Sequence, residues 1–240
     1  MFRPIYAPRT RAREYCDLAV NIYTGCSHGC TYCYARAMAK RFAGKKYAFK
    51  FDTPEVRPGI VEAVSRQLVG MRGQGKKIML CFMCDPYPIG YDTFATREVI
   101  RAIKDSGNHV QILTKGNEEA QRDFDLLDSN DSFGVTWSGA EFIGNAEPGA
   151  ASHKQRHTTL FMAKNSGIGT WVSCEPVLDP ASIYAAIETL DCVDMFRIGK
   201  LNHKKSGIDW ARFGRKAEAL CQQHGRIYYI KEDLRKAMEA

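Results

Sequence analysis

Three cysteines within eight residues constrain this sequence more than any other feature. Cys26, Cys30 and Cys33 have the spacing CxxxCxxC. Thiolates are the side chains with which proteins hold iron-sulfur clusters. A [4Fe-4S] cluster contains four irons, so three cysteines leave one iron without a protein ligand. An open coordination position on a metal is typical of a reactive site rather than of a structural one.

Two other uses of these cysteines remain open. Zinc could be bound with His28 or Cys16 as the fourth ligand, although the paired CxxC motifs of many structural zinc sites are missing. A disulfide is disfavoured because the chain has nine cysteines, an odd number. No secretory signal is recognisable that would place the chain in an oxidising compartment.

The composition fits a folded α/β protein. The chain has 240 residues, of which 45% are hydrophobic, which is enough for one large domain with its own core. No apolar run approaches the roughly 20 residues that a membrane-spanning helix needs. We therefore expect a soluble, cytoplasmic protein without a membrane partner.

Positive charge is concentrated at the start of the chain. Residues 1–50 contain ten Lys or Arg and two acidic residues, a balance of +8, whereas the whole chain carries +7. Residues 1–15 hold four arginines and show neither helical nor strand periodicity, which predicts a basic N-terminal arm. A second basic run, with aromatic residues interleaved, lies at 40–51. Such segments contact nucleic acid in some proteins and are solvated tails, straps or faces in others, and both interpretations stay open.

Apolar runs alternate with segments of helical composition along the rest of the chain. Strands are predicted at residues 16–23, 77–83, 109–113, 133–137, 170–174 and 193–198, with a further candidate at 226–230. Helices are predicted at residues 34–42, 60–71, 93–106, 118–128, 151–165, 180–190 and 209–224. Strands that alternate with helices pair in parallel through right-handed crossovers. We therefore predict an α/β fold, a partial (β/α)6 TIM-like barrel, as a single domain over residues 16–240.

Polar residues follow the predicted strands where each strand ends. These residues are the three cysteines, Cys84-Asp85, Thr114-Lys115, Ser138, Glu175 and Gly199-Lys200. Parallel α/β folds place their sites at the carboxyl ends of the strands, in the loops that follow them. The sequence therefore predicts that these side chains share one site. Tyr87 and Trp137 also lie at strand exits, where they could stack on a base or pack in the core.

Four motifs together resemble a known family. They are CxxxCxYCY at the cysteines, DPYP at residues 85–88, LTK at 113–115, and EPxAxSxxxRxxxL at 147–160 followed by Ser-Gly-Ile. They resemble the spore photoproduct lyase-like branch of the radical S-adenosylmethionine (SAM) enzymes, often labelled DNA repair photolyases. The resemblance spans roughly residues 19–174. The later part is more similar to small radical SAM proteins, some of them carried by bacteriophages.

The resemblance implies a cofactor set and a reaction. In this family Cys26, Cys30 and Cys33 would hold a [4Fe-4S] cluster whose fourth iron binds SAM. One electron, from a donor such as flavodoxin or ferredoxin, then cleaves SAM to a 5'-deoxyadenosyl radical. By the same resemblance Tyr32 would pack near the adenine and Lys115 would reach the SAM carboxylate. Asp85, Ser138 and Glu175 would line the SAM pocket.

The lyase also uses a cysteine near its second strand to return a hydrogen atom, and Cys81 and Cys84 lie in that region. If the strand alternates regularly, the two side chains point in opposite directions, so at most one faces the barrel axis. Cys84, at the strand exit, is the better candidate for a catalytic residue. A cysteine that only packs is an equally good interpretation.

The first hypothesis is therefore a radical SAM enzyme that acts on a nucleic acid or nucleotide base, in repair or modification. The chain is shorter than the lyase and lacks its further C-terminal region, so the resemblance does not extend to dimer repair itself. The alternatives are a radical SAM enzyme for a small molecule or peptide, and a non-enzymatic module that binds zinc or an iron-sulfur cluster.

Overall fold

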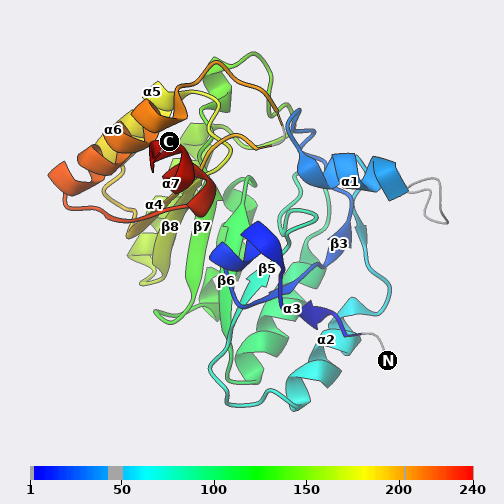
Figure 1. The fold of residues 1–240 in the computed structure, drawn as a ribbon. Coiled ribbons are helices and arrows are strands. Elements are labelled where there is room, and N and C mark those ends of the chain that lie inside the picture. Colours follow the sequence, from blue (N-terminus) through cyan, green and yellow to red (C-terminus); the bar gives the residue numbers. More distant parts are fainter. Residues whose placement is uncertain (1–2, 43–50, 203, 240) are drawn as a thin grey trace.

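The computed structural model describes residues 3–42, 51–202 and 204–239, so most of the basic run at 40–51 lies outside the described residues. Seven parallel strands form one twisted sheet in chain order, and the antiparallel strand β1 (Ile5–Tyr6) extends its first edge (Figure 1). The parallel strands are β2 (Leu18–Val20), β5 (Lys77–Leu80), β6 (His109–Thr114), β7 (Ser132–Thr136), β8 (Gly169–Cys174), β9 (Met195–Ile198) and β10 (Ile227–Ile230).

Helices connect successive strands, as the alternating pattern predicts. They are α1 (Tyr34–Phe42), α2 (Ile60–Val69), α3 (Phe94–Asp105), α4 (His153–Asn165), α5 (Pro180–Thr189), α6 (Trp210–Gln223) and α7 (Glu232–Glu239), with shorter 3-10 segments η1 (Thr10–Glu14), η2 (Glu118–Leu126) and η3 (Ala140–Phe142). The segment η2, predicted as an ordinary helix, is 3-10 in form. Its Asp123 is fully buried and forms ion pairs with Arg97 and Arg122, and these pairs hold η2 in place.

The predicted α/β architecture is confirmed, with two additions. The candidate strand at 226–230 is β10, a seventh parallel strand, and β1 adds an antiparallel edge. Within the described residues the sheet runs from β1 to β10 without closing, so the barrel is partial. A second, two-stranded sheet joins β3 (Tyr23–Thr24) to β4 (Glu55–Val56) beside the cysteine loop.

Strand alternation divides the core into an outer and an inner layer. Ile78 and Leu80 belong to the large core between the sheet and the helices, whereas Met79 packs on the inner face with Ala19 and Trp171. The inner face needs one glycine: a Cβ on Gly134 would lie 2.4 Å from the Trp171 indole. The inner layer therefore forms a packed floor under the carboxyl edge of the sheet.

The described residues of the N-terminal segment pack against the sheet. Ile5 pairs with Val20 and is 4% exposed, and both of its backbone polar groups bond the side chain of Gln67. The boundary between an arm and the barrel at residue 15 stays a prediction. Among the described residues, no helix combines the length and the apolar character that crossing a bilayer requires.

Candidate functional site

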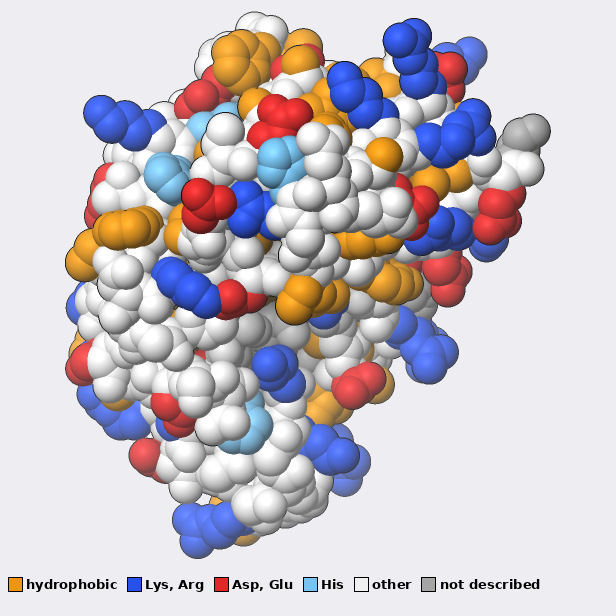
Figure 2. All heavy atoms as spheres, turned by 90° about the vertical axis from the view of Figure 1, so that its left-hand side faces the viewer, with side chains coloured by type: hydrophobic (Ala, Val, Ile, Leu, Met, Phe, Trp, Pro, Cys, Tyr) orange, Lys and Arg blue, Asp and Glu red, His pale blue; other side chains and the backbone are white. Residues whose placement is uncertain are grey.

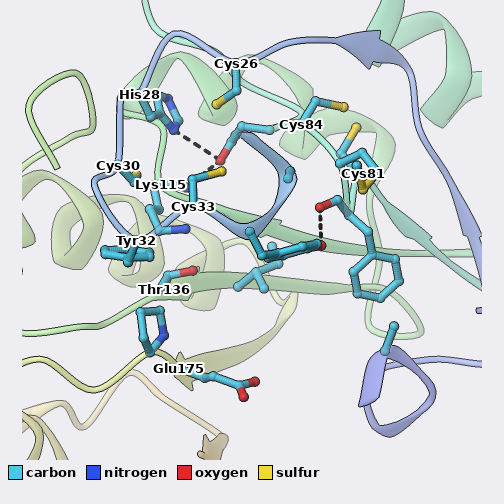
Figure 3. A pocket seen from close by; sticks show the side chains of 18 of the residues that line it. Cys26, His28, Cys30, Tyr32, Cys33, Cys81, Cys84, Lys115, Thr136 and Glu175 are labelled. Atoms are coloured by element: carbon cyan, nitrogen blue, oxygen red, sulfur yellow. Dashed lines mark hydrogen bonds and ion pairs between the residues drawn. The ribbon is translucent and has the colours of Figure 1, made fainter. Parts of the chain in front are cut away.

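The three cysteines line one cavity at the carboxyl edge of the sheet. The cavity has a volume of about 690 Å³, and Figure 3 shows Cys26, Cys30 and Cys33 grouped at one end of it. Their loop follows β3 and runs into α1. The backbone N–H of Arg36, in the first turn of α1, donates to the Cys33 Sγ at 3.4 Å. A helix N-terminus stabilises a negative sulfur ligand.

The spacing of the sulfur atoms bears on the kind of metal. The described residues contain one group of three potential ligands whose atoms all lie within 4.8 Å of one another, and it consists of His109, Asp128 and Asp131, at the amino-terminal ends of β6 and β7. The three thiols are therefore not gathered around a single tetrahedral ion. A cluster differs from an ion because each cysteine binds a separate iron. The donor set thus fits a [4Fe-4S] cluster better than zinc.

His28 is not available as a fourth ligand. Its Nδ1 lies 3.4 Å from the Asp85 carboxylate, and its Nε2 accepts from the Ile89 N–H at 3.5 Å. The ring is 1% exposed, and burial lowers its pKa in spite of the neighbouring carboxylate. Cys16, the other candidate for a zinc site, packs on the inner face of the sheet and is not among the side chains that line the cavity.

Asp85, in the loop after β5, contacts residues that follow β3 and residues at the end of β6, as its position after a strand predicts. Its carboxylate accepts from the Thr114 hydroxyl at 2.5 Å and from the Lys115 N–H at 2.9 Å, besides contacting His28. It is 7% exposed and lines the cavity. Because its oxygens already have these partners, Asp85 positions the loop after β6 relative to the cysteine loop.

Lys115 supplies the positive charge at the cysteine end. Its Nζ lies 5.8 Å from the centre of the Tyr32 ring, and both residues line the cavity. Burial lowers the pKa of Lys115, but the negative groups around it, Cys30 first, outweigh burial and raise the pKa overall. The ammonium group therefore remains charged, and it has no hydrogen-bonded or ion-paired partner among the described residues. This arrangement suits an anionic group of a ligand.

Ser138 lies behind the cavity wall rather than in it. Its hydroxyl donates to Glu147 at 2.7 Å, and it is fully buried. Thr136, two residues earlier, lines the cavity instead. Glu147 also accepts from the Tyr32 hydroxyl and pairs with the buried Arg156. Burial alone would raise the pKa of Glu147, but Arg156 and Lys115 lower it to about 2.

Glu175 lies at the opposite end of the cavity from the cysteines (Figure 3). Its carboxylate accepts from the Tyr15 hydroxyl at 2.7 Å and from the Asn202 Nδ2 at 2.9 Å, and it pairs with Lys231. Sequence reasoning singled out Glu175 but missed its partners. Lys231 directly follows β10, so the strand-exit rule could have found it, whereas nothing in the sequence marks Tyr15.

The prediction that at most one of Cys81 and Cys84 faces the barrel axis is wrong, because both line the cavity. The β5 ladder ends at Leu80, and Cys81 has a φ of +62°, so the backbone turns and regular alternation stops there. Burial raises the pKa of Cys81, and so does its contact with the Cys84 thiol. The two sulfur atoms are therefore neighbours.

Tyr87 and Trp137, for which base stacking and core packing were both open, are core residues. Tyr87 is 1% exposed and donates to Asp123 at 3.1 Å. Trp137 is stacked on His153 with ring centres 4.2 Å apart, and its Nε1 donates to Ser182. Neither ring is placed to stack on a base.

The same architecture occurs in solved radical SAM enzymes. A mutant of spore photoproduct lyase with a dinucleoside spore photoproduct aligns at a TM-score of 0.72 and 12% identity, over 94% of this chain and 79% of that chain. SuiB of Streptococcus suis bound to the precursor peptide SuiA aligns at 0.64 and 12% identity, over 92% and 50%. The fold is therefore that of the radical SAM enzymes.

The chain belongs to the family described as Protein of unknown function (DUF5131), whose model matches residues 10–231. An uncharacterized protein of Methanocaldococcus jannaschii is 28% identical over 73% of this chain and 65% of its own length. An uncharacterized protein of the Acidianus two-tailed virus is 25% identical over 69% and 57%. The chain thus spans less than two thirds of the length of these curated relatives.

Proposed function

We propose that this protein is a radical SAM enzyme in which Cys26, Cys30 and Cys33 hold a [4Fe-4S] cluster and SAM binds at the iron that lacks a cysteine. One observation carries the proposal. The three side chains line a single cavity at the carboxyl edge of a parallel sheet, yet they do not converge on one ion. That combination is expected of cluster ligands and not of a structural zinc site.

The residues around the cysteines have separable roles in this proposal. When bound, the cluster and SAM supply a 5'-deoxyadenosyl radical, formed with one electron from an external donor such as flavodoxin or ferredoxin. The Lys115 ammonium binds the SAM carboxylate, and the Tyr32 ring packs near the adenine. Asp85 and Ser138 act through their partners, because Asp85 fixes Lys115 and Ser138 fixes Glu147.

Cys84 is the catalytic residue that we propose for the return of hydrogen. Its S–H bond breaks as a C–H bond forms on the substrate radical. An electron from the external donor and a proton from solvent then restore the thiol. Both Cys84 and Cys81 line the cavity, but Cys84 is the more exposed of the two. A thiol that a substrate can reach is required for this step.

A nucleic acid or nucleotide base is the substrate class that we propose. The first 50 residues carry a balance of +8, and Arg11 from this segment lines the cavity. The similar spore photoproduct lyase holds a dinucleoside photoproduct. The face in Figure 2 adds nothing to this proposal, because basic and acidic side chains are interspersed on it. SuiB, with its bound precursor peptide, favours a peptide as the second candidate.

Anaerobic reconstitution tests the chemistry. We expect about four irons per chain and formation of 5'-deoxyadenosine from SAM and dithionite. The Cys30→Ala variant should lose both, whereas Cys192→Ala, a substitution at a buried cysteine outside the cavity, should lose neither. Zinc without sulfide in the purified protein, or 5'-deoxyadenosine formed by Cys30→Ala, would overturn the proposal. Stimulation of SAM cleavage by a peptide but not by DNA would favour the second candidate.

A further inference from the structure

The cavity has two polar ends built from different parts of the chain. The cysteine end is formed by the loops after β3, β5 and β6. The other end is formed by η1 and by the loops after β8, β9 and β10, and its polar side chains are Arg11, Tyr15, Glu175, Lys200, Asn202 and Lys231. Apolar residues such as Met79, Phe82 and Leu113 also line the cavity. A cofactor that reaches the thiols leaves the second end for another ligand.

The polar side chains of the second end are organised around Glu175. Three donors from separate segments converge on its carboxylate: Tyr15, Asn202 and Lys231. Lys231 is 3% exposed and also lies 4.2 Å from the centre of the Tyr15 ring. A buried ion pair contributes little net stability, because desolvation offsets the attraction. Such a network is therefore better explained by the positioning of neighbouring groups than by stability.

One basic side chain at the Glu175 end has no partner among the described residues. Arg11 pairs with Asp233, and Lys231 pairs with Glu175. Lys200 lines the cavity, and its side chain has no hydrogen-bond or ion-pair partner among the described residues. The segment after β9 also carries Lys204 and Lys205 and contains no acid up to Ile208. An unpaired cation in a preorganised, partly enclosed end is suited to an anionic group.

The segment after β9 also contacts the cysteine loop. Lys204 donates to the carbonyl oxygen of Thr31, in the cysteine loop, at 2.6 Å. Asn202, two residues after Lys200, donates through its Nδ2 to Glu175 at 2.9 Å and to the Lys200 carbonyl oxygen at 3.4 Å, which leaves its side-chain Oδ1 as an acceptor with no hydrogen bond among the described residues. A ligand held by Lys200 would therefore meet a fixed hydrogen-bond acceptor on the same segment.

We propose that the Glu175 end of the cavity is the substrate subsite, and that Lys200 binds a phosphate of a nucleotide, free or within a nucleic acid. Asn202, fixed by Glu175, accepts a hydrogen bond from the base or sugar. Glu175 thus positions a residue that binds the substrate, rather than one that binds SAM. This inference rests on the proposed function. It places SAM at the cysteine end and the substrate at the Glu175 end of one cavity.

The test compares Lys200→Gln with Lys154→Gln in the reconstituted protein. Lys154 is an exposed lysine on α4 outside the cavity, so its substitution makes the same change of charge elsewhere. The probe is a fluorescein-labelled single-stranded DNA of about ten nucleotides, followed by anisotropy over a range of salt concentrations. Lys200→Gln should weaken binding about tenfold at low salt. It should also make the slope of log K against log salt shallower by about 0.7, the value for one phosphate contact on a single strand.

Competitors separate the two sources of phosphate. If a single nucleotide is enough for binding, thymidine monophosphate should displace the probe from the unchanged protein. Thymidine, which lacks the phosphate, should not displace it. If only an oligonucleotide displaces it, the phosphate belongs to a polymer. Equal affinity and slope in Lys200→Gln and Lys154→Gln would overturn the inference even if SAM is cleaved. Loss of binding in Lys200→Gln without any 5'-deoxyadenosine formation would instead refute the proposed chemistry and leave the phosphate site standing.

Discussion

Arg156 and Glu147 form a buried ion pair behind the cysteine loop. Their side chains are 1% and 5% exposed, and Arg156 also donates to the carbonyl oxygen of Thr136 at 2.8 Å. Through Glu147 the pair reaches the hydroxyl of Tyr32. The segment that carries Glu147 also bonds the cysteine loop through its backbone, because the Gly149 N–H donates to the His28 carbonyl at 2.9 Å. The loop after β7 thus braces the loop of the cysteines.

Removing the negative charge of this pair should destabilise the fold. In Glu147→Gln the Arg156 guanidinium stays buried without a counter-ion, which costs about 3–5 kcal/mol of unfolding free energy. Urea denaturation followed by circular dichroism measures the loss. The exposed Glu188, which has no side-chain partner among the described residues, provides the control Glu188→Gln. A loss under 1 kcal/mol, or equal losses in both variants, would contradict the role of the pair.

The ion pair of Glu147 and Arg156 makes the stability of the fold depend on pH. The pKa of Glu147 is lowered from 4.5 to about 2. A depressed carboxyl pKa contributes stability that is fully present above about pH 4.5 and is lost as the pH falls through about 2. The contribution is on the order of 3 kcal/mol at neutral pH, from about 1.4 kcal/mol per pKa unit. The difference in melting temperature between the unchanged protein and Glu147→Gln should therefore shrink between pH 5 and pH 2. A difference that stays constant over this range would show that the carboxyl group is not responsible.

Close packing between the two loops predicts a glycine requirement. A Cβ on Gly149 would lie 2.5 Å from the carbonyl oxygen of Ser27, in the cysteine loop. Because that contact is with backbone, Gly149→Ala should displace the loop and lower the iron bound per chain after reconstitution by half or more. It should also cost about 1–3 kcal/mol of stability, as overpacking does. The control is Gly144→Ala, in the same segment, where a Cβ meets nothing within 4 Å. Equal iron content in both variants would refute the steric argument.

The sequence was sufficient to bring the cysteines, Asp85 and Lys115 together. Their positions follow from one rule, because the carboxyl ends of parallel strands meet at one edge of a sheet. The direction of Cys81 was not predictable, since the regular alternation of a strand fails where the backbone adopts a positive φ. Strand periodicity carries no sign of such a turn.

The hydrogen-bond networks around Glu147 and Glu175 could not be predicted from the sequence, for a different reason. Glu147 lies in an irregular stretch, and its partner Tyr32 is 115 residues away in the chain. Tyr15 and Glu175 are 160 residues apart. Neither pair shares a strand-helix repeat, so the rule that places the strand exits says nothing about their contact. Only the packed structure places these groups side by side.

The charge on Lys115 gives a prediction about SAM. Lys115→Gln retains a polar side chain, one bond shorter, but removes the cation beside Tyr32. The affinity of the reconstituted protein for SAM should fall about tenfold, because a charge-assisted contact to a carboxylate becomes a neutral one. Equilibrium dialysis with labelled SAM measures this, and Lys154→Gln is the matched control. An unchanged dissociation constant would remove Lys115 from the SAM site.

Cys84 and Cys81 can be told apart by the isotope that reaches the product. Thiol protons exchange with solvent, so turnover in D2O of a DNA that stimulates SAM cleavage should place one deuterium in the product. Cys84→Ala should abolish this incorporation while 5'-deoxyadenosine still forms, because the radical is made at the cysteine end without Cys84. Cys81→Ala is the matched control, since it removes the neighbouring thiol from the same cavity. Mass spectrometry of the product distinguishes the outcomes. If Cys81→Ala loses the deuterium and Cys84→Ala keeps it, the donor is the buried cysteine at the turn, and the proposal for Cys84 is wrong.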